Sequence, residues 1–184
     1  VVILAGYTNE IKVFIDSNKN FWFMLYDQGC CFVEGQTLKS HLFSYKDMGV
    51  KKGKLVSSIT EQHGTAVPSF SNGTLCRIDG IHKKVLWTNP YLTQNHPNKD
   101  DGTFSFIDSR NNYWVLTNGE AYIYCSAQKK WYVGMHAFMD NQKVAMPTRE
   151  RVLIRDIATS KDGKTWIATD HLGLLVVDYA HKIC

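Results

Sequence analysis

The feature that most constrains the fold is a sequence unit that occurs four times along the chain. Its clearest marker is a tryptophan after a polar turn, at Trp22, Trp114 and Trp166, with Ala66 in the corresponding place of a degenerate copy. Positions 22, 66, 114 and 166 are separated by 44, 48 and 52 residues. A second marker is a glycine that follows each of these positions: Gly29, Gly73, Gly119 and Gly173. Four units of about 46 residues fill the 184-residue chain, and a period of this length indicates a repeat architecture.

Each unit contains short runs of β-branched and aromatic residues between turns rich in Asp, Ser, Asn and Gly, which is typical of strands. The predicted innermost strands are residues 13–15, 104–107 and 154–159, and the predicted outer strands are 84–88 and 130–133. Four strands of about five or six residues fill one unit. Such a sheet has two apolar faces, which radial stacking of sheets buries. The chain is therefore predicted to be all-β, a β-propeller segment of about four four-stranded blades, centred near 11–36, 57–81, 104–127 and 152–180.

The repeated tryptophans have two interpretations: packing between blades, or a platform on which carbohydrate stacks. Because they occupy the same place in each unit, packing is favoured for Trp22, Trp114 and Trp166.

Two turns also have alternative readings. Residues 16–20 begin like a calcium loop but lack its later ligands, so a hairpin turn capped by its own side chains is expected. Residues 160–166, SKDGKTW, resemble the Asp-box of sialidase-type propellers, a structural hairpin.

Composition excludes several classes of function. The net charge is +4 with scattered lysines, so no direct nucleic acid contact is expected. The five cysteines (Cys30, Cys31, Cys76, Cys125 and Cys184) form no CxxC pair or zinc-type set, which indicates structural thiols, with one disulfide as the alternative. No metal site, cofactor or catalytic residue is predicted. No apolar run is long enough to span a bilayer, and the start at Val1 suggests a segment of a longer protein.

Candidate ligand-binding residues lie in the connections that the repeat does not dictate. Connections between blades, at roughly 39–55, 89–103 and 134–151, should emerge on the same face as the loops between second and third strands. The side chains selected from these loops are Tyr26, Asp27, Tyr91, His96, His136, Arg149, Asp170 and His171.

The last unit resembles the repeat of two-component regulator propellers. Residues 154–182, IRDIATSKDGKTWIATDHLGLLVVDYAHK, match its pattern closely, with Ala168 in place of a glycine. Residues 15–33, IDSNKNFWFMLYDQGCCFV, and 107–124, IDSRNNYWVLTNGEAYIY, are weaker matches, and residues 59–79 match only near their glycine.

This resemblance implies the periplasmic sensor half of a bacterial hybrid two-component system, in which seven-bladed propellers precede a membrane helix and a histidine kinase. Four blades would be part of one such propeller, and the membrane would be reached only through the rest of the parent protein. The resemblance further implies a non-catalytic segment that recognises oligosaccharides, signals through rearrangement of a dimer and controls transcription.

Two other functions remain open from the sequence. One is a propeller enzyme acting on glycans, a hydrolase or lyase, which would need a pair of carboxylates with one raised pKa. Against it, none of the five arginines lies in a recognisable sialidase frame. The other is a purely structural interaction propeller. Whatever the function, an arc of blades that does not close leaves the outer faces of its first and last blades exposed. Homo-oligomers formed through the propeller region are therefore expected.

Overall fold

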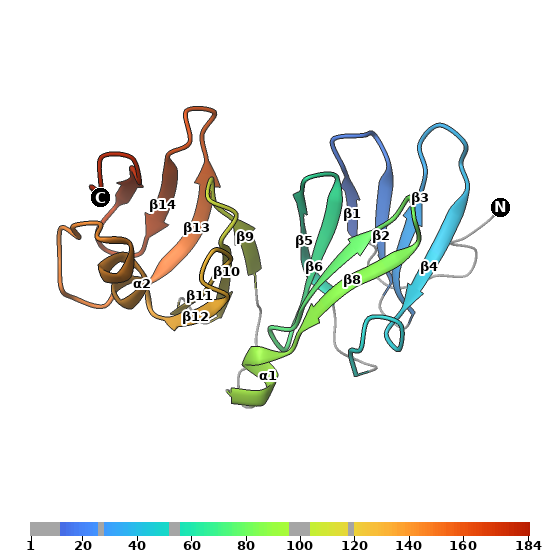
Figure 1. The fold of residues 1–184 in the computed structure, drawn as a ribbon, viewed down its shortest axis with the longest axis horizontal. Coiled ribbons are helices and arrows are strands. Elements are labelled where there is room, and N and C mark those ends of the chain that lie inside the picture. The colour runs from blue at the N-terminus through green and yellow to red at the C-terminus, as the bar shows by residue number, and fades with distance from the viewer. Residues whose placement is uncertain (1–11, 26–27, 52–55, 96–103, 118–119) are drawn as a thin grey trace. The chain divides into compact units, whose positions relative to one another are not determined.

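The computed structural model describes residues 12–25, 28–51, 56–95, 104–117 and 120–184, which form four antiparallel sheets in two compact units (Figure 1). Unit 1 comprises residues 1–91 and unit 2 comprises residues 92–184. Every sheet is a meander in which each strand pairs with the next one in sequence, as expected for short strands joined by tight turns. The sheets correspond to the four predicted repeats and are called blades 1 to 4.

Unit 1 contains blades 1 and 2. The strands of blade 1 are β1 (Lys12–Ile15), β2 (Phe21–Leu25), β3 (Gly29–Val33) and β4 (Ser40–Ser44). Those of blade 2 are β5 (Val56–Gln62), β6 (Thr65–Phe70), β7 (Leu75–Asp79) and β8 (Lys84–Asn89). The short helix α1 (Tyr91–Asn95) follows β8 and lies at the boundary between the units.

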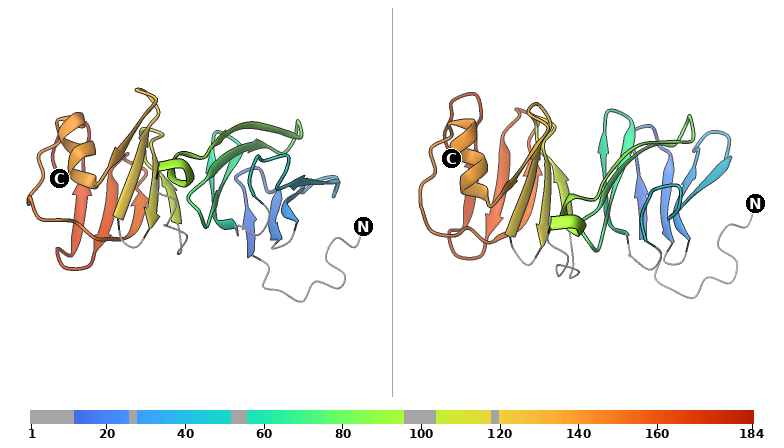
Figure 2. Two further views of the ribbon diagram at one scale, coloured as in Figure 1. Left: turned by 90° about the horizontal axis from the view of Figure 1, so that it is seen from below. Right: turned by 60° about the horizontal axis from the view of Figure 1, so that its bottom comes forward.

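Unit 2 contains blades 3 and 4. The strands of blade 3 are β9 (Phe104–Ile107), β10 (Tyr113–Thr117), β11 (Glu120–Cys125) and β12 (Lys130–Val133). Helix α2 (Met135–Gln142) follows, and blade 4 is made of β13 (Ile154–Thr159), β14 (Thr165–Thr169) and β15 (Leu174–Val177). The two views in Figure 2 show α2 beside the strands of unit 2.

The predicted strand positions are largely confirmed. The expected inner strands coincide with β1, β9 and β13, and the expected outer strands with β8 and β12. One expectation about connections is wrong: the segment 39–55 contains β4, so this connection is shorter than expected. The segment 134–151 lies between β12 and β13, as expected for a connection between blades, and it contains helix α2.

The predicted hairpin turn at residues 16–20 is confirmed, because a buried aspartate organises it. The Asp16 carboxylate accepts hydrogen bonds from the Asn18 and Asn20 backbone N–H groups at 3.0 and 2.9 Å. It also accepts one from Asn20 Nδ2 at 3.1 Å and one from the Trp22 indole at 3.1 Å. Both carboxylate oxygens therefore have partners within the hairpin, which explains how a charge tolerates this burial.

Blade 3 repeats this turn with one additional partner. Asp108 accepts from the backbone N–H groups of Arg110 and Asn112, both at 2.9 Å, and from Asn112 Nδ2 at 3.0 Å. The Trp114 indole donates to it at 2.9 Å, and the Tyr179 hydroxyl, which follows β15, donates at 2.8 Å. The Asp108 carboxylate thus joins blade 3 to blade 4.

The core of unit 1 lies between blades 1 and 2. Trp22 is buried there, with Phe32 tilted against it at 4.9 Å and Phe43 stacked at 6.1 Å between ring centroids. Blade 2 contributes to the same cluster Ile59, Ala66, Phe70, Cys76 and Ile78. The predicted role of Trp22 in packing between blades is confirmed.

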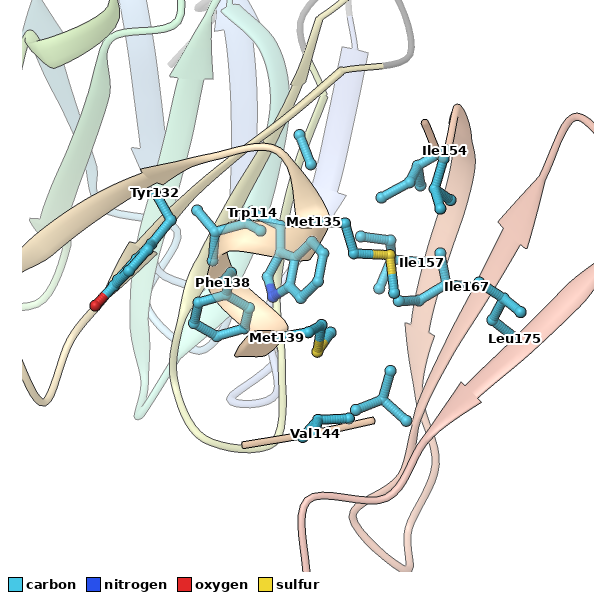
Figure 3. Close-up of a cluster of buried hydrophobic side chains, with 14 of the residues drawn as sticks. Trp114, Tyr132, Met135, Phe138, Met139, Val144, Ile154, Ile157, Ile167 and Leu175 are labelled. Carbon is cyan, nitrogen blue, oxygen red and sulfur yellow. The ribbon is translucent and has the colours of Figure 1, made fainter. Parts of the chain in front are cut away.

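The core of unit 2 has the same plan, with α2 added (Figure 3). Trp114 is fully buried and meets Phe138 of α2 edge to face, at 5.4 Å between ring centroids. Blade 4 contributes a second set of apolar side chains: Ile154, Ile157, Ile167, Leu175 and Val177. The predicted packing role of Trp114 is confirmed as well.

Ala66 is the second residue of β6, as Trp22 is the second residue of β2, but its side chain lies on the opposite face of its sheet. Ala66 packs into the same cluster as Trp22, so it faces the preceding blade and not the following one. Its hairpin closes with a Gln62–Thr65 pair, whereas that of blade 1 spans residues 16–20 between Ile15 and Phe21. Since side chains alternate along a strand, an odd change in turn length reverses the face that each position presents.

Trp166 corrects the prediction that all three tryptophans pack between blades. Its side chain is 38% exposed, while its neighbours Thr165 and Ile167 are fully buried. Ile167 belongs to the core shared with blade 3, so Trp166 occupies the opposite face of blade 4, against which no other described sheet of unit 2 packs. The turn before it nevertheless has the expected form, with Gly163 at φ 81° and its N–H bonded to the Ser160 carbonyl at 3.0 Å.

Replacing Asp108 with Ala should destabilise unit 2 by about 3 kcal/mol, because five donors lose a buried acceptor. Urea unfolding followed by tryptophan fluorescence measures the change. The control is Asp162→Ala in the exposed turn of blade 4, which should change the free energy of unfolding by less than about 0.5 kcal/mol. Equal losses in the two variants would contradict the anchoring role of Asp108.

Candidate functional site

One end of the strands of unit 2 gathers the loops that the repeat leaves variable. The Gly134 N–H donates to the Ala121 carbonyl at 2.8 Å, and the Asp170 N–H donates to the Leu153 carbonyl at 3.1 Å. The connection into α2 therefore meets the start of β11, and the segment before β13 meets the β14–β15 loop. The contact between His136 and the Thr148 carbonyl joins these two pairs. We call this surface, made of residues 120–121, 134–136, 148–155 and 169–173, the loop face of unit 2.

His136 and Arg149 are both held by local contacts. A His136 ring nitrogen, Nε2, lies 2.9 Å from the Thr148 carbonyl oxygen, which ties the start of α2 to the segment before β13. Arg149 Nη1 donates to both oxygens of Asp140 in α2, at 3.0 and 3.1 Å. Its side chain is exposed, so the guanidinium remains open to solvent on its other edges.

Asp170 pairs with an arginine across the loop face. Arg155 Nη2 donates to Asp170 Oδ2 at 2.6 Å, and Arg155 Nε donates to Oδ1. The hydrogen bonds from Arg155 hold the pKa of the Asp170 carboxyl below its usual value, and the charge of the adjacent His171 acts in the same direction. Hydrogen bonding to Asp170 also raises the pKa of Arg155. Both groups are therefore charged at neutral pH.

The structure brings four of the predicted ligand-binding residues into unit 2: His136, Arg149, Asp170 and His171. Tyr91 belongs to unit 1, where it begins α1 and its N–H donates to Asn89 Oδ1 at 3.1 Å. The remaining three, Tyr26, Asp27 and His96, lie outside the described residues.

Two residues of this face were missed from the sequence: Arg151 and Arg155. Arg151 Nη2 lies 3.7 Å from Glu120 Oε2, and Arg155 pairs with Asp170. A signal was present, because three of the five arginines fall at positions 149, 151 and 155. Such a density of arginines over a short stretch of sequence indicates a surface rich in planar hydrogen-bond donors.

The loop face offers exposed guanidinium donors beside carboxylate acceptors. This pattern can bind hydroxyl groups, which both donate and accept, without any transfer of a proton. Every carboxyl group of the described residues whose pKa departs from its ordinary value has that pKa lowered: Asp47, Asp79, Asp162, Asp170 and Asp178. A glycosidase acid needs a raised pKa. Within the described residues, no group of three His, Cys, Asp or Glu side chains could hold a metal ion.

The cysteines are free thiols, and four of the five are buried. Burial raises the pKa of Cys30, and the nearby Cys76 adds to this effect. Burial also raises the pKa of Cys76 to about 12, against an opposing hydrogen bond with Thr88. A thiol with such a pKa is not a nucleophile at neutral pH, so these side chains act as small apolar groups in the core.

No family model matches the chain, and no curated protein matches it significantly. Among solved structures, it is similar to the extracellular domain of a hybrid two-component system from B. thetaiotaomicron, with 18% identity, a TM-score of 0.57 and coverage of 95% of this chain and 21% of that one. A second such domain from B. thetaiotaomicron gives 17% identity, a TM-score of 0.58 and coverage of 92% and 21%. The C-terminal WD40 domain of Sif2 gives 14% identity, a TM-score of 0.54 and coverage of 94% and 47%.

At these identities the likeness concerns the fold, and it confirms the predicted β-propeller class. The predicted resemblance to extracellular propellers of two-component systems is confirmed at the level of structure. The chain spans about a fifth of the length of the first two domains, each covered to 21%. In the part of the chain that the structure describes, no helix has the length and apolar character to cross a bilayer.

Replacing Arg155 with Gln should raise the pKa of Asp170 towards its ordinary value of about 3.9, because the carboxylate loses its charged donor. In the native chain the stabilisation from this pair is present above the unfolded-state pKa and is lost as the pH falls through the lowered folded-state pKa. A pH titration of carboxyl carbon shifts by NMR measures both values. Arg149→Gln, which removes a different pair, should leave Asp170 unchanged, and an equal shift in both variants would be inconsistent with a specific contact.

The thiols of Cys30 and Cys76 should resist alkylation by iodoacetamide at pH 8 in the folded chain, because burial keeps them protonated and inaccessible. Both should react fully in 6 M guanidinium chloride. Peptide mass mapping after a timed reaction distinguishes the sites, with the half-buried Cys184 as the internal comparison that reacts sooner. Rapid labelling of Cys30 in the native state would contradict the core assignment.

Proposed function

We propose that this chain is a non-catalytic segment of the extracytoplasmic sensor region of a hybrid two-component system. The observation that carries the proposal is the structural likeness of 92–95% of the chain to extracellular domains of such systems. The sequence repeat, whose last copy at residues 154–182 resembles the two-component regulator propeller, supports the same assignment independently. In this proposal the region is periplasmic, and the membrane anchor and histidine kinase belong to the rest of the parent protein.

The ligand class we propose is an oligosaccharide, bound on the loop face of unit 2. The side chains of Arg149, Arg151 and Arg155 are exposed, and each is paired with a carboxylate. These pairs offer hydrogen-bond donors and acceptors beside one another on the protein surface. Sugar hydroxyls can replace the solvent around these pairs while the pairs stay intact, so binding needs little rearrangement of the charges. Occupancy is then passed on through rearrangement of a receptor dimer, which controls transcription.

Calorimetric titration of the chain, and of the complete extracellular region of its parent, with a panel of oligosaccharides tests this proposal. We expect at least one member to bind, and the double variant Arg151→Gln/Arg155→Gln to weaken it about tenfold or more through loss of charged donors. The matched control is Lys161→Gln, in the turn at the other end of blade 4. Absence of binding by the complete region across the panel would refute the oligosaccharide, and equal weakening by the control would refute the loop face.

A further inference from the structure

The hairpin turn after the third strand has the same form in all four blades. It spans six residues, at 34–39, 79–84, 125–130 and 178–183. In three of these turns the carboxylate at the first position pairs with the side chain at the fourth: Glu34 with Thr37, Asp79 with His82 and Asp178 with His181. The turns are therefore ordered, and each holds its fifth and sixth residues at the same end of the strands.

Lysine occupies these last two positions in most blades. The fifth residue has a left-handed backbone in every turn, and in blades 2 to 4 it is Lys83, Lys129 or Lys182, with φ of 55°, 52° and 58°. Glycine and asparagine adopt this backbone more readily than lysine does. The sixth residue is a lysine in blades 1 to 3: Lys39, Lys84 and Lys130. All six lysines are exposed. Their recurrence at a position that disfavours them indicates that the charge itself matters there.

An exposed apolar side chain accompanies the lysines in three of the four turns. Leu38 is 66% exposed, Ile81 is 50% exposed and Ile183 is 56% exposed. Blades of this chain bury their sheet faces against one another, whereas these side chains lie in turns at the strand ends. Stacking of further blades on the sheet faces would therefore leave them exposed. The combination of lysine with an exposed apolar residue is a property of the turn itself.

In unit 2 the fold brings these lysines together with others that are scattered along the sequence. The β9–β10, β11–β12 and β13–β14 hairpins and the turn after β15 lie at the end of the strands opposite the loop face, because successive strands are antiparallel. The end of α2 joins them, since the Ala145 N–H donates to the Lys182 carbonyl at 3.1 Å. We call this surface, made of residues 108–112, 125–130, 141–145, 159–165 and 178–183, the turn end of unit 2.

The turn end of unit 2 is strongly basic, although the net charge of the whole chain is only +4. Its three carboxylates are Asp108, which is buried and hydrogen-bonded, Asp162, which pairs with Lys164 at 3.1 Å, and Asp178, which pairs with His181. The loop face of unit 2 instead balances three arginines with three carboxylates. The turn end carries seven cationic side chains: Arg110, Lys129, Lys130, Lys143, Lys161, Lys164 and Lys182.

We propose that the turn end of unit 2 binds the surface of an anionic phospholipid bilayer. A basic cluster of this size matches the polybasic surfaces that bind anionic lipids. The exposed Ile183 beside Lys182 adds an apolar contact, and apolar and basic groups together bind a membrane more firmly than either does alone. This contact directs the loop face away from the bilayer. The proposal stands apart from the sensor function, because it needs no ligand on that face.

Two properties favour a bilayer over a soluble acidic polymer. Six of the seven cations at the turn end are lysines, whereas the three on the loop face are arginines. Lysine is a hydrated point charge, which suits a fluid array of phosphate headgroups, while arginine suits bidentate contact with a fixed anion. The exposed Ile183 gains nothing from a hydrophilic polymer, but it leaves water at the headgroup boundary of a bilayer.

Sedimentation with lipid vesicles tests the proposal, for the chain and for the complete extracellular region of its parent. Binding to vesicles of phosphatidylglycerol and phosphatidylcholine in equal parts should be about tenfold or more tighter than binding to phosphatidylcholine alone. The difference should shrink as salt screens the charges. Equal partition onto both kinds of vesicle, or no binding to the anionic ones, would overturn the proposal. Binding by the chain that the complete region lacks would also overturn it and assign the turn end to a contact within the parent protein.

Removal of two lysines locates the contact. Lys129→Gln/Lys182→Gln should weaken binding to the anionic vesicles about tenfold or more, since each lysine near an anionic surface contributes about fivefold. The matched control is Lys46→Gln/Lys51→Gln, which removes the same charge from the connection after β4, at the opposite end of the strands of unit 1. All four side chains are exposed, so folding should be retained, as urea unfolding checks. Equal weakening by the two double variants would contradict a site at the turn end.

Ile183→Ser separates a bilayer from a soluble polyanion. It should weaken vesicle binding about threefold or more through loss of the apolar contact, while binding to dextran sulfate stays unchanged. The comparison variant Lys182→Gln should weaken both. No effect of Ile183→Ser on vesicle binding would refute the bilayer, and firm binding of dextran sulfate would then make the turn end a site for an acidic polymer.

Discussion

The structure depends on the burial of sheets that are apolar on both faces. A single antiparallel meander of this composition cannot hide two such faces, so each blade must be covered by another layer. In both units the cover is a second blade, and the contact centres on an indole ring, Trp22 or Trp114, whose large area dominates the buried surface. The equivalent places of Trp22 and Trp114 on the second strands of blades 1 and 3 follow from this requirement, because each side chain fills the contact with the next blade.

A polar interaction sets the position of each buried tryptophan side chain. The indole N–H groups of Trp22 and Trp114 donate to the carboxylates of Asp16 and Asp108, which lie in the hairpin turns just before the strands of these tryptophans. A buried indole without an acceptor would be costly, and so would a buried carboxylate without donors. The indole N–H and the carboxylate satisfy each other. The same carboxylate also accepts hydrogen bonds from backbone N–H groups of the turn and so orders it. Blade 4 has Ser160 at the equivalent position, and its Trp166 is the one left exposed.

The sequence predicted the strands and the turns well because both signals are local. Residues 104–107 and 154–159 contain β-branched or aromatic residues and are followed by turn residues, and the structure has strands with those bounds. The orientation of Ala66 was missed because it depends on turn length, which changes the face of every later residue in the strand. Helix α2 was missed because it begins after Gly134 without a capping side chain and ends at Lys143 in a left-handed conformation where glycine is usual.

The candidate site could be predicted only in part for a related reason. Placement of His136, Arg149, Asp170 and His171 in variable loops follows from the repeat, but the partner of each depends on how loops distant in sequence meet. Arg155 lies inside a strand, where the repeat suggested scaffold, yet it falls at the register shift between Ile154 and Asp156, and its side chain pairs with Asp170 of the β14–β15 loop. A bulge of this kind re-aims one side chain without disturbing the sheet, as is common beside binding sites. The same rigid blade can thus keep its buried face constant while a single extra residue changes which side chain its end exposes.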